Sequence, residues 1–352
     1  MSPNYVASLE PGAQAAVDRI NAEGGVHGRP LEVVICEDGS NANVAATCAR
    51  QFASDESIVA TVGDVSSYGG DYNPPLEQAG VAGIGTTPLS PGDFASPRVF
   101  ATNSGGLSFL GMGVFLVEEL DAQGVGVATL DNPTSQALPD MVGGALAPLG
   151  AEVAGVSTVP VTSADVAPQA AALVDTDAQI VGLTEDLSMR YIRSSRQQGF
   201  DGPLIVSQTL VNASTLEEGL TDAELEAVYA ITWFDKSSDG YAEFLADLEE
   251  FQPDAEPTDL ETNAWLAVNM FADVASGLDE VSRESILEAM SSVSDYDTGG
   301  LTPAIDYSEE GTALGGTAPR LVPSALSVYA DVYRDGTWAP YAEDQEPINA
   351  IS

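Results

Sequence analysis

Small polar residues follow several of the predicted apolar strands, at the point where each strand ends. Ser66 and Ser67 come directly after the run IVATVGDV, and Thr86 and Thr87 close the run VAGIGTT. In parallel α/β sheets, ligands bind outside the carboxyl ends of the strands, where helix N-terminal N–H groups favour anions. Taken singly, each of these residues is also an N-cap candidate, because Ser and Thr are preferred at that position.

The second half of the chain repeats this pattern. The stretch TLDNPTS places Asn132 and Ser135 after one predicted strand, and SQTLVNAS places Gln208 after another. Glu185 directly follows a third strand, QIVGLT. Strand ends of this kind in both halves favour a ligand cleft over a set of unrelated N-caps.

The residues needed for common catalytic centres are scarce. His27 is the only histidine and lies in a glycine-rich turn, so Ser-His-Asp, Cys-His and two-histidine metal arrangements have no support. Lys236 is the only lysine and follows WFD, so there is no phosphate-binding loop. No GxGxxG follows the early strands, which leaves a nicotinamide site unsupported. The sequence therefore predicts a protein that is not an enzyme, with no metal and no cofactor.

The net charge of the chain limits the classes of molecule that are expected to bind it. Eleven Lys and Arg residues against 54 Asp and Glu residues give a formal net charge of −43. Such a surface repels phosphate backbones and anionic membranes, so nucleic acid is not an expected partner. We interpret the charge as a hydrated acidic shell that aids solubility, with recruitment of a basic partner as the alternative.

The two cysteines, Cys36 and Cys48, lie at the end of a predicted strand and on the helix that follows it. With one histidine in the chain, a metal site is not credible. We expect a disulfide, and two free buried thiols are the alternative. A disulfide indicates an oxidising compartment, although Met1 is followed by SPNYVASLEPG and not by the basic and apolar regions of a signal peptide.

Helices and strands alternate along most of the chain. Pro11 opens a helix that ends at Gly24 and Gly25. The expected elements that follow are strand 31–36, helix 44–52, strand 58–63, helix 71–79, strand 81–86, helix 107–121, strand 124–131, helix 138–149, strand 151–161, helix 167–174, strand 179–184, helix 186–198, strand 203–208 and strand 226–234. Three helices (240–251, 259–277 and 283–292) come next, and the tail from 324 to 341 reads as a hairpin around an Asp-Gly turn.

This alternation is typical of parallel sheets covered by helices on both faces. We predict an α/β fold of two Rossmann-like lobes joined by a hinge with more than one crossover. Lobe 1 is expected to comprise residues 1–103 and 233–323, and lobe 2 residues 104–232 and 324–352. The ligand cleft is expected between them.

One long stretch resembles a known family. The residues GAQAAVDRINAEGGVHGRPLEVVICEDGSNANVAATCARQF at 12–52 are similar to the opening of the leucine/isoleucine/valine-type solute-binding proteins of ABC importers. VGDVSS, GIGTTPLSP and VFATN continue the likeness, which covers nearly the whole chain and is strongest over 12–103. The resemblance implies the type I periplasmic-binding fold. It also implies a receptor that closes on a small solute by hinge bending and presents it to a membrane permease.

The resemblance also implies roles for individual residues. In the family, hydroxyl and main-chain N–H groups of one lobe hold the ligand carboxylate, and the matching positions here are Ser67 and the pair Thr86 and Thr87. Tyr5 matches an aromatic residue that closes over the ligand. The resemblance leads us to expect a monomer that works with an ABC permease.

Two positions depart from the family's amino-acid binders. Where those proteins use a tyrosine and a glutamate to meet the ligand's ammonium group, this chain has Ser135 and Gln208. A buried ammonium needs a charged acceptor, because an unpaired buried ion costs several kcal/mol. We therefore expect a carboxylate or amide that lacks an α-ammonium group. The alternative is an amino acid, with Glu185 as the acceptor.

The start of the sequence raises a further expectation. Family members place a strand ahead of the residues that match MSPNY, and an export signal ahead of that strand. The resemblance implies an extracytoplasmic location, periplasmic or lipid-anchored at the cell surface, with both segments lying upstream of the sequence given. The alternative is that this lobe is built differently from those of the family. The alternative from another class is the ligand-sensing domain of a membrane receptor, which shares the fold.

Overall fold

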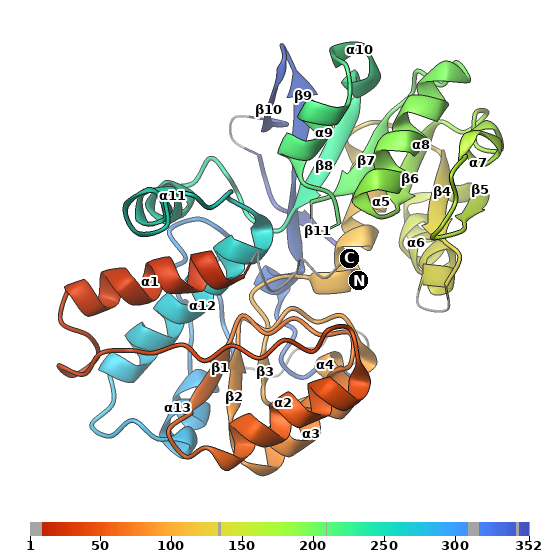
Figure 1. Ribbon diagram of the computed structural model, residues 1–352. Helices are drawn as coiled ribbons and strands as arrows, with labels where there is room; N and C mark the ends of the chain where they lie inside the picture. Colours follow the sequence, from red (N-terminus) through yellow and green to blue (C-terminus); the bar gives the residue numbers. More distant parts are fainter. Residues whose placement is uncertain (1–8, 133–134, 209, 309–316, 343–344, 352) are drawn as a thin grey trace. The chain divides into compact units, whose positions relative to one another are not determined.

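The computed structural model describes residues 9–132, 135–208, 210–308, 317–342 and 345–351. The chain divides into two compact units (Figure 1). Unit 1 comprises residues 1–106 and 234–327, and unit 2 comprises residues 107–233 and 328–352. Each unit contains a parallel sheet flanked by helices, which confirms the α/β prediction.

The sheet of unit 1 has three short parallel strands in the order β1-β2-β3. They are β1 (Ala60–Val62), β2 (Ala82–Ile84) and β3 (Val99–Phe100). Ala82 and Ile84 are both fully buried, as expected for a strand with neighbours on both sides. Gly63 and Gly85 follow β1 and β2 directly with positive φ, a conformation that ends a strand and that glycine adopts at little cost.

Two groups of helices enclose this sheet. The elements are α1 (Glu10–Ala22), α2 (Ala42–Ser54), α3 (Gly69–Gln78), α4 (Pro91–Ala95), α11 (Asp239–Phe251), α12 (Asp259–Ser276) and α13 (Arg283–Met290). Helix α12 contacts α1, α11, α13, β1 and β2, whereas α2 packs on α3 and α3 on α4. Helix α1 comes so close to α12 that a Cβ on Gly12 would lie 2.1 Å from the carbonyl oxygen of Glu261.

The predicted strand at 31–36 is wrong. Among the described residues, no backbone–backbone hydrogen bond involves residues 32–36, and this segment has no regular secondary structure. Val34 and Ile35 are 51% and 42% exposed, although their types favour a buried strand. The physical reason is that a strand needs a partner along its edge, and the described residues supply none here.

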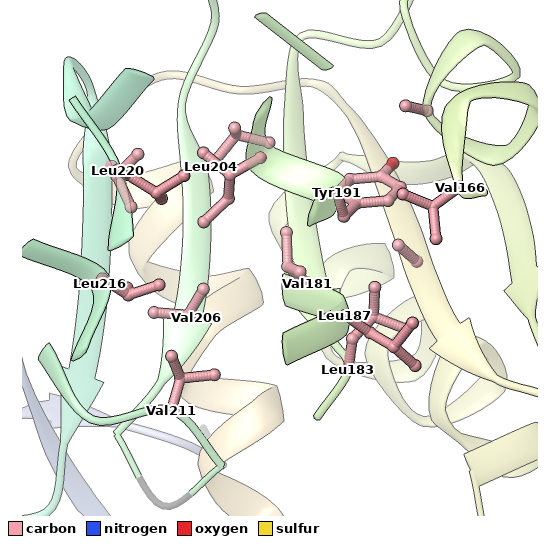
Figure 2. Close-up of a cluster of buried hydrophobic side chains, with 14 of the residues drawn as sticks. Val166, Val181, Leu183, Leu187, Tyr191, Leu204, Val206, Val211, Leu216 and Leu220 are labelled. Atoms are coloured by element: carbon pink, nitrogen blue, oxygen red, sulfur yellow. The ribbon is translucent and has the colours of Figure 1, made fainter. Parts of the chain in front are cut away.

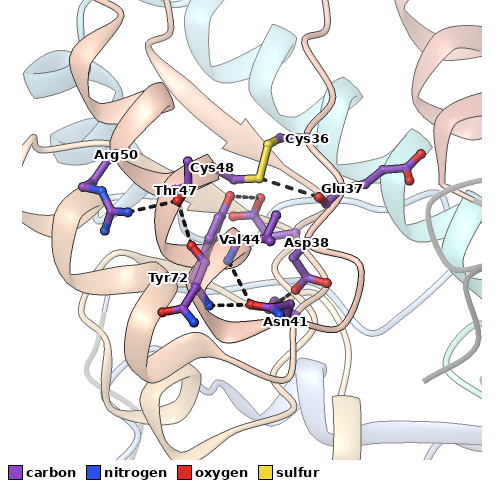
Figure 3. The surroundings of a disulfide bond; sticks show 12 residues. Cys36, Glu37, Asp38, Asn41, Val44, Thr47, Cys48, Arg50 and Tyr72 are labelled. Carbon is purple, nitrogen blue, oxygen red and sulfur yellow. Dashed lines mark hydrogen bonds between the residues drawn. A yellow bond between two sulfur atoms is a disulfide. The ribbon is translucent and has the colours of Figure 1, made fainter.

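A disulfide joins this extended segment to α2, as Figure 3 shows. Cys36 and Cys48 have their Cα atoms 5.8 Å apart, so the predicted disulfide is confirmed. Cys48 is buried with Phe52 of α2 and with Tyr72 and Leu76 of α3. The disulfide therefore attaches the extended segment to helix α2. Among the described residues, residues 32–36 of this segment make no backbone hydrogen bond that would hold them to a sheet.

Unit 2 has the larger sheet. Its strands are β4 (Gly124–Leu130), β5 (Glu152–Val159), β6 (Ala178–Gly182), β7 (Leu204–Ser207), β8 (Val228–Thr232), β9 (Ser327–Arg334), β10 (Thr337–Pro340) and β11 (Ile348–Asn349). The order is β10-β9-β8-β7-β6-β4-β5, and β11 pairs with β9. Strands β4 to β8 run parallel, while β9 and β10 form the predicted antiparallel hairpin around Asp335 and Gly336.

Helices also cover the sheet of unit 2. They are α5 (Ser108–Glu118), α6 (Leu138–Leu146), α7 (Ala167–Ala171), α8 (Glu185–Gln197), α9 (Ala213–Gly219) and α10 (Asp222–Leu225). Short 3-10 turns lie at Ser135–Ala137 and Ala147–Leu149 in unit 2, at Pro323–Leu326 in unit 1, and at Gly105–Leu107 where the chain passes from unit 1 to unit 2. Helix α5 lies on β6, β7 and β8, and a Cβ on Gly111 would meet Val328 at 2.4 Å. The absence of a side chain at Gly111 therefore allows α5 to pack closely against Val328.

Figure 2 shows the apolar core beneath α8 in unit 2. Leu187 and Tyr191 of α8 are buried with Val181 of β6 and Val206 of β7. The hydroxyl of Tyr191 donates a hydrogen bond to Gln179 (2.9 Å), so this polar group is satisfied inside the core. In the described part of the chain, no helix is both long enough and apolar enough to cross a bilayer.

Replacing Cys36 and Cys48 together by serine should lower the free energy of unfolding by about 2–3 kcal/mol, because the cross-link restricts the unfolded chain over a short loop. Urea denaturation with and without a reducing agent measures this effect. The reductant should shift the midpoint of the parent protein and leave that of the double variant unchanged. Equal midpoints for parent and variant would contradict the structural role of the disulfide.

Glu261, at the start of α12, makes stability depend on pH. Its carboxylate accepts a hydrogen bond from the Thr258 amide (2.9 Å), but burial dominates and raises its pKa from 4.5 to about 7. An acid whose pKa is higher in the folded state destabilises that state once the pH exceeds the unfolded pKa. The folded protein should therefore lose stability as the pH rises from about 4.5 to about 7.

Glu261→Gln should remove this dependence, because the glutamine carbonyl still accepts from Thr258 and carries no charge. We expect the variant to be more stable than the parent by about 2–3 kcal/mol at pH 8 and similar to it at pH 4. Denaturant titrations at the two pH values measure the difference. If Glu261→Gln is more stable than the parent by the same amount at pH 4 and at pH 8, ionisation of Glu261 is not the cause of the gain.

Candidate functional site

The polar strand ends of unit 1 lie next to each other. The amide of Thr87, after β2, donates to the carbonyl oxygen of Asp64, after β1, at 2.8 Å, and Val65 forms a parallel bridge with Thr87. The loop that carries Ser66 and Ser67 therefore runs beside the Thr86–Thr87 segment. Adjacent parallel strands account for this, because their carboxyl ends meet at one edge of the sheet.

Ser66 and Ser67 do not act as side-chain caps of the helix that follows them. Helix α3 has Tyr68 at its N-cap position and no side-chain cap hydrogen bond. The hydroxyl of Ser66 instead donates to Asp38 (2.6 Å) and accepts from the amide of Tyr68 (3.1 Å). The N-cap interpretation of this pair is therefore wrong for α3.

Thr86 and Thr87 are almost completely buried, at 2% and 1% exposure. The Thr86 hydroxyl donates to Asp64 at 3.5 Å, and the Thr87 hydroxyl accepts from the side-chain amide of Asn103 at 3.2 Å. Asn103 also donates to Asn263 of α12 (2.9 Å). The strand ends are thus tied to a helix and form a fixed polar wall.

An ion pair between the buried Arg98 and the partly buried Asp64 supports this wall. Arg98 is 2% exposed and lies 3.3 Å from the carboxylate of Asp64. Its guanidinium also donates to Thr61 (2.5 Å), to Asn73 (2.6 Å) and to the carbonyl oxygen of Val81 (2.7 Å). Because Asp64 precedes Ser66 by two residues, Arg98 positions the serine loop through that carboxylate.

In unit 2, Asn132 and Ser135 belong to one loop after β4. The Asn132 side chain accepts from the amide of Ser135 (2.9 Å), and Thr129 of β4 donates to the Ser135 carbonyl oxygen (2.9 Å). These bonds fold the loop back onto its own strand. Strand β4 is the neighbour of β6, so this loop follows the same sheet edge as Glu185.

Glu185 is the first residue of α8, directly after the β6 strand end. Its carboxylate accepts a hydrogen bond from the amide of Asn212 (3.1 Å), and Asn212 caps α9. Glu185 therefore links the loops that follow β6 and β7. A carboxylate at a helix N-terminus is also stabilised by the helix dipole.

Gln208 follows β7 and lies beside the carboxylate of Asp331, which is not among the predicted site residues. Its side-chain amide donates to Asp331 at 2.6 Å, and its backbone amide donates to Ile231 of β8 at 2.9 Å. Asp331 is 3% exposed and lies on β9. In the sequence, the only sign that Asp331 has a special role is that it is the one acidic residue in the largely apolar stretch SVYADVYR.

The remaining predicted positions divide as follows. Tyr5 lies outside the described residues. His27 lies in a turn closed by reciprocal backbone hydrogen bonds between Val26 and Arg29 (both 3.0 Å), and its ring nitrogen is 3.0 Å from the Ala275 carbonyl oxygen. Among the described residues, no group of three or more His, Cys, Asp or Glu side chains is arranged to hold a metal ion.

Comparison with known sequences shows the family to which this chain belongs. The sequence profile of the periplasmic binding proteins matches residues 3–317. The chain belongs to the periplasmic binding protein family. This is an extracytoplasmic family that binds solutes, and the match confirms the resemblance to solute-binding proteins of the periplasmic-binding fold. A search of curated protein sequences finds no match to the chain.

Solved structures share the fold across nearly the whole chain. The branched-chain amino acid binding protein LivJ of Streptococcus pneumoniae, in complex with isoleucine, has 20% identity and a TM-score of 0.72, with 95% of this chain and 93% of that chain covered. The leucine binding protein LivK of Thermotoga maritima has 19% identity and a TM-score of 0.74, covering 98% and 94%. A fatty acid transporter binding protein of Thermomonospora curvata has 16% identity and a TM-score of 0.76, covering 96% and 87%.

These three proteins are named for different solutes, and their identities to this chain are low. The likeness therefore shows the fold and does not select among isoleucine, leucine and a fatty acid.

Arg98→Met should destabilise unit 1 by about 3 kcal/mol, because it leaves the carboxylate of Asp64 without its buried counter-charge. Adding Asp64→Asn to the same protein should recover part of this loss, since the uncompensated charge is then gone. Urea denaturation of the parent, of Arg98→Met, of Asp64→Asn and of the double variant gives a double-mutant cycle. A double variant whose loss equals the sum of the two single losses would contradict the ion-pair interpretation.

Proposed function

We propose that this protein is the extracytoplasmic solute-binding receptor of an ABC importer, and that it binds a small carboxylate- or amide-containing solute. The two units act as lobes that close on the solute by hinge bending and present it to the membrane permease. The protein works as a monomer and catalyses no reaction. It resides in the periplasm or is held at the cell surface by a lipid anchor.

The observation that carries this proposal is the polar wall of unit 1. Ser66 and Ser67 share a sheet edge with Thr86 and Thr87, and a hydrogen bond between the backbones of the two loops holds them together. Hydroxyl and amide donors at the carboxyl edge of a parallel sheet suit an anionic carboxylate or an amide oxygen. Arg98 is paired with Asp64, and the hydroxyls of Ser66 and Thr86 donate to carboxylates of the protein. In this proposal the solute is therefore bound by Ser67, Thr87 and backbone N–H groups of the two loops.

The type of residue at position 208 supports a solute without an α-ammonium group. Gln208 is uncharged, and its side-chain amide donates to Asp331. Asn132 and Ser135 are likewise uncharged and are hydrogen-bonded to each other within their loop. A solute that presents neutral polar groups to these residues avoids burying an unpaired cation.

A second candidate is a true amino-acid binder, and two observations in unit 2 favour it. Asp331 brings a carboxylate to within one hydrogen bond of Gln208, and Glu185 stands at the neighbouring strand end. Either carboxylate offers the charge that an ammonium group requires. A sensory domain of a membrane receptor is the candidate from another class, and a membrane-spanning segment in the gene or the absence of neighbouring permease genes would favour it.

Matched solutes separate the two candidate ligands. We expect 4-methyl-2-oxopentanoate or a simple carboxamide to raise the melting temperature of the protein, because a ligand that binds only the folded state stabilises it. Leucine, which has the same side chain as the oxo acid and adds the ammonium group, should raise it less. The measurement is a thermal-shift screen followed by calorimetric titration. Tighter binding of leucine would favour the amino-acid candidate instead.

Amino-acid substitutions test whether the polar wall of unit 1 binds the solute. Ser67→Ala should weaken binding of the best solute about tenfold, the usual cost of losing one hydrogen bond to a charged group. Ser54→Ala, at the exposed end of α2, is the matched control and should leave the affinity unchanged. If no carboxylate, amide or amino acid raises the melting temperature of the parent protein, the receptor proposal is wrong.

A further inference from the structure

Acidic residues are concentrated along one stretch of unit 1. Residues 239–261 comprise α11, the connection that follows it and the first turn of α12, and they contain nine acidic residues and no basic one. The nine are Asp239, Glu243, Asp247, Glu249, Glu250, Asp254, Glu256, Asp259 and Glu261. Acidic residues occupy 54 of the 352 positions of the whole chain, so this stretch carries more than twice the average density of negative charge.

The positions of these acids are unfavourable for helix α11. Asp239, Glu243 and Asp247 follow one another at intervals of four residues, which places like charges on one face of the helix. Glu249 and Glu250 lie in the last turn, where the helix dipole favours cations, and that turn has no basic residue. Both effects destabilise α11, and both become weaker as dissolved salt screens the charges.

The start of α12 places further carboxylates in buried positions. Asp259 and Glu261 are only 2% and 3% exposed. Burial raises the pKa of Glu261 to about 7, and the negative charge of Glu256 acts in the same direction. The fold therefore holds carboxylates in places where a negative charge is unfavourable.

Arg19 of α1 supplies a positive charge to this stretch. Its Nε donates to the carboxylate of Asp247 at 2.8 Å, and its guanidinium also donates to Asn269 of α12. Trp265 of α12 donates to the same Asp247 carboxylate at 2.7 Å. One arginine and one aspartate thus join α1, α11 and α12.

Most other basic residues of unit 1 are engaged elsewhere. Unit 1 has seven basic residues against 32 acidic ones, and the residues outside the described ranges include no Lys or Arg. Four of the seven make their hydrogen bonds to groups outside residues 239–261, namely Arg50, Arg98, Arg283 and Arg320. The fixed cations of the protein therefore offset only a small part of the negative charge on α11.

Apolar packing opposes this repulsion. Phe244 and Leu248 of α11 are buried, and the ring of Phe244 lies 6.0 Å from that of Trp265, measured between centroids. Helix α11 packs on α1 and α12, and Figure 1 shows it on the side of these two helices that faces away from β1, β2 and β3. The position of α11 is thus a balance between apolar contacts on one face and negative charge on the other.

We infer that α11 packs on α1 and α12 only in a medium of high ionic strength, about 1 M or more, in which mobile cations screen the acids of residues 239–261. The Debye length is about 10 Å at 0.1 M salt and about 3 Å at 1 M, whereas side chains four residues apart on a helix are about 5–6 Å apart. Their repulsion is therefore felt at 0.1 M and largely removed at 1 M. The cations form a diffuse layer and occupy no fixed site, and the protein is suited to saline surroundings.

Amide hydrogen exchange on the whole chain measures the packing of α11, and no solute is needed. We expect residues 244–251 to exchange at least about tenfold faster in about 0.1 M KCl than in about 2 M KCl, each rate being taken relative to the unfolded chain in the same salt. Strand β7 in unit 2, which is buried and uncharged, should change by less than about threefold. Equal acceleration at both places would mean that the whole protein unfolds, which contradicts a separate response of α11.

Substitutions test whether charge is the cause. Glu249→Gln combined with Glu250→Gln removes two charges from the last turn of α11 and should lower the ratio of the two exchange rates at residues 244–251 at least about twofold. Glu217→Gln combined with Glu218→Gln is the matched control, because these glutamates are likewise adjacent and exposed in the last turn of α9. The control should leave the ratio unchanged. Equal effects of the two double variants would contradict a local cause at α11.

Other additives separate screening from its alternatives. NaCl should slow exchange at residues 244–251 as KCl does at the same concentration. A response to MgCl₂ that is complete below about 10 mM would show a bound divalent cation and would overturn the inference of a diffuse layer. About 1 M sucrose favours compact states without screening charge, and it should recover less than half of the effect of KCl. Full recovery in sucrose would show that charge does not control α11.

Discussion

Edge-to-edge pairing of parallel strands is the constraint on which the rest of this structure depends. A parallel strand exposes N–H and C=O groups along both edges, and each edge must find a partner or water. In unit 2 the strands from β5 to β8 meet this need in one continuous ladder. In unit 1 the ladder of the described residues ends at β1. The extended segment 31–36, which precedes β1 in the sequence, is attached by a disulfide, and its residues 32–36 form no backbone hydrogen bond to another described segment.

The same pairing builds the proposed site. Because neighbouring strands run in one direction, the loops after β1 and β2 must emerge at one edge, and the Thr87 amide bonds to the Asp64 carbonyl oxygen there. The buried guanidinium of Arg98 then holds the Asp64 side chain from below. The hydroxyl-bearing wall is therefore a product of sheet geometry and one internal ion pair. In unit 2, hydrogen bonds from Asn212 to Glu185 and from Gln208 to Asp331 organise the corresponding edge.

The fold of this chain is shared with proteins that are named for different solutes. Proteins at 16–20% identity keep the architecture over almost the whole chain, and they are named for solutes as different as isoleucine and a fatty acid. Helix packing through small residues such as Gly12 and Gly111 is compatible with many surfaces. At the end of β7 in this chain, the uncharged side chain of Gln208 donates a hydrogen bond to the buried carboxylate of Asp331.

The sequence by itself determined the α/β class, the alternation of elements, the closing hairpin and the disulfide, because hydrophobic period, turn glycines and cysteine placement are local signals. It also placed Ser66, Thr87 and Gln208 at strand ends. Only the tertiary structure decided that residues 31–36 form no strand and that Ser66 does not cap helix α3. It also decided that Gln208 donates a hydrogen bond to Asp331, which lies 123 residues further along the chain. Strand pairing, burial and long-range hydrogen bonds depend on which segments become neighbours in space, and no local pattern contains that information.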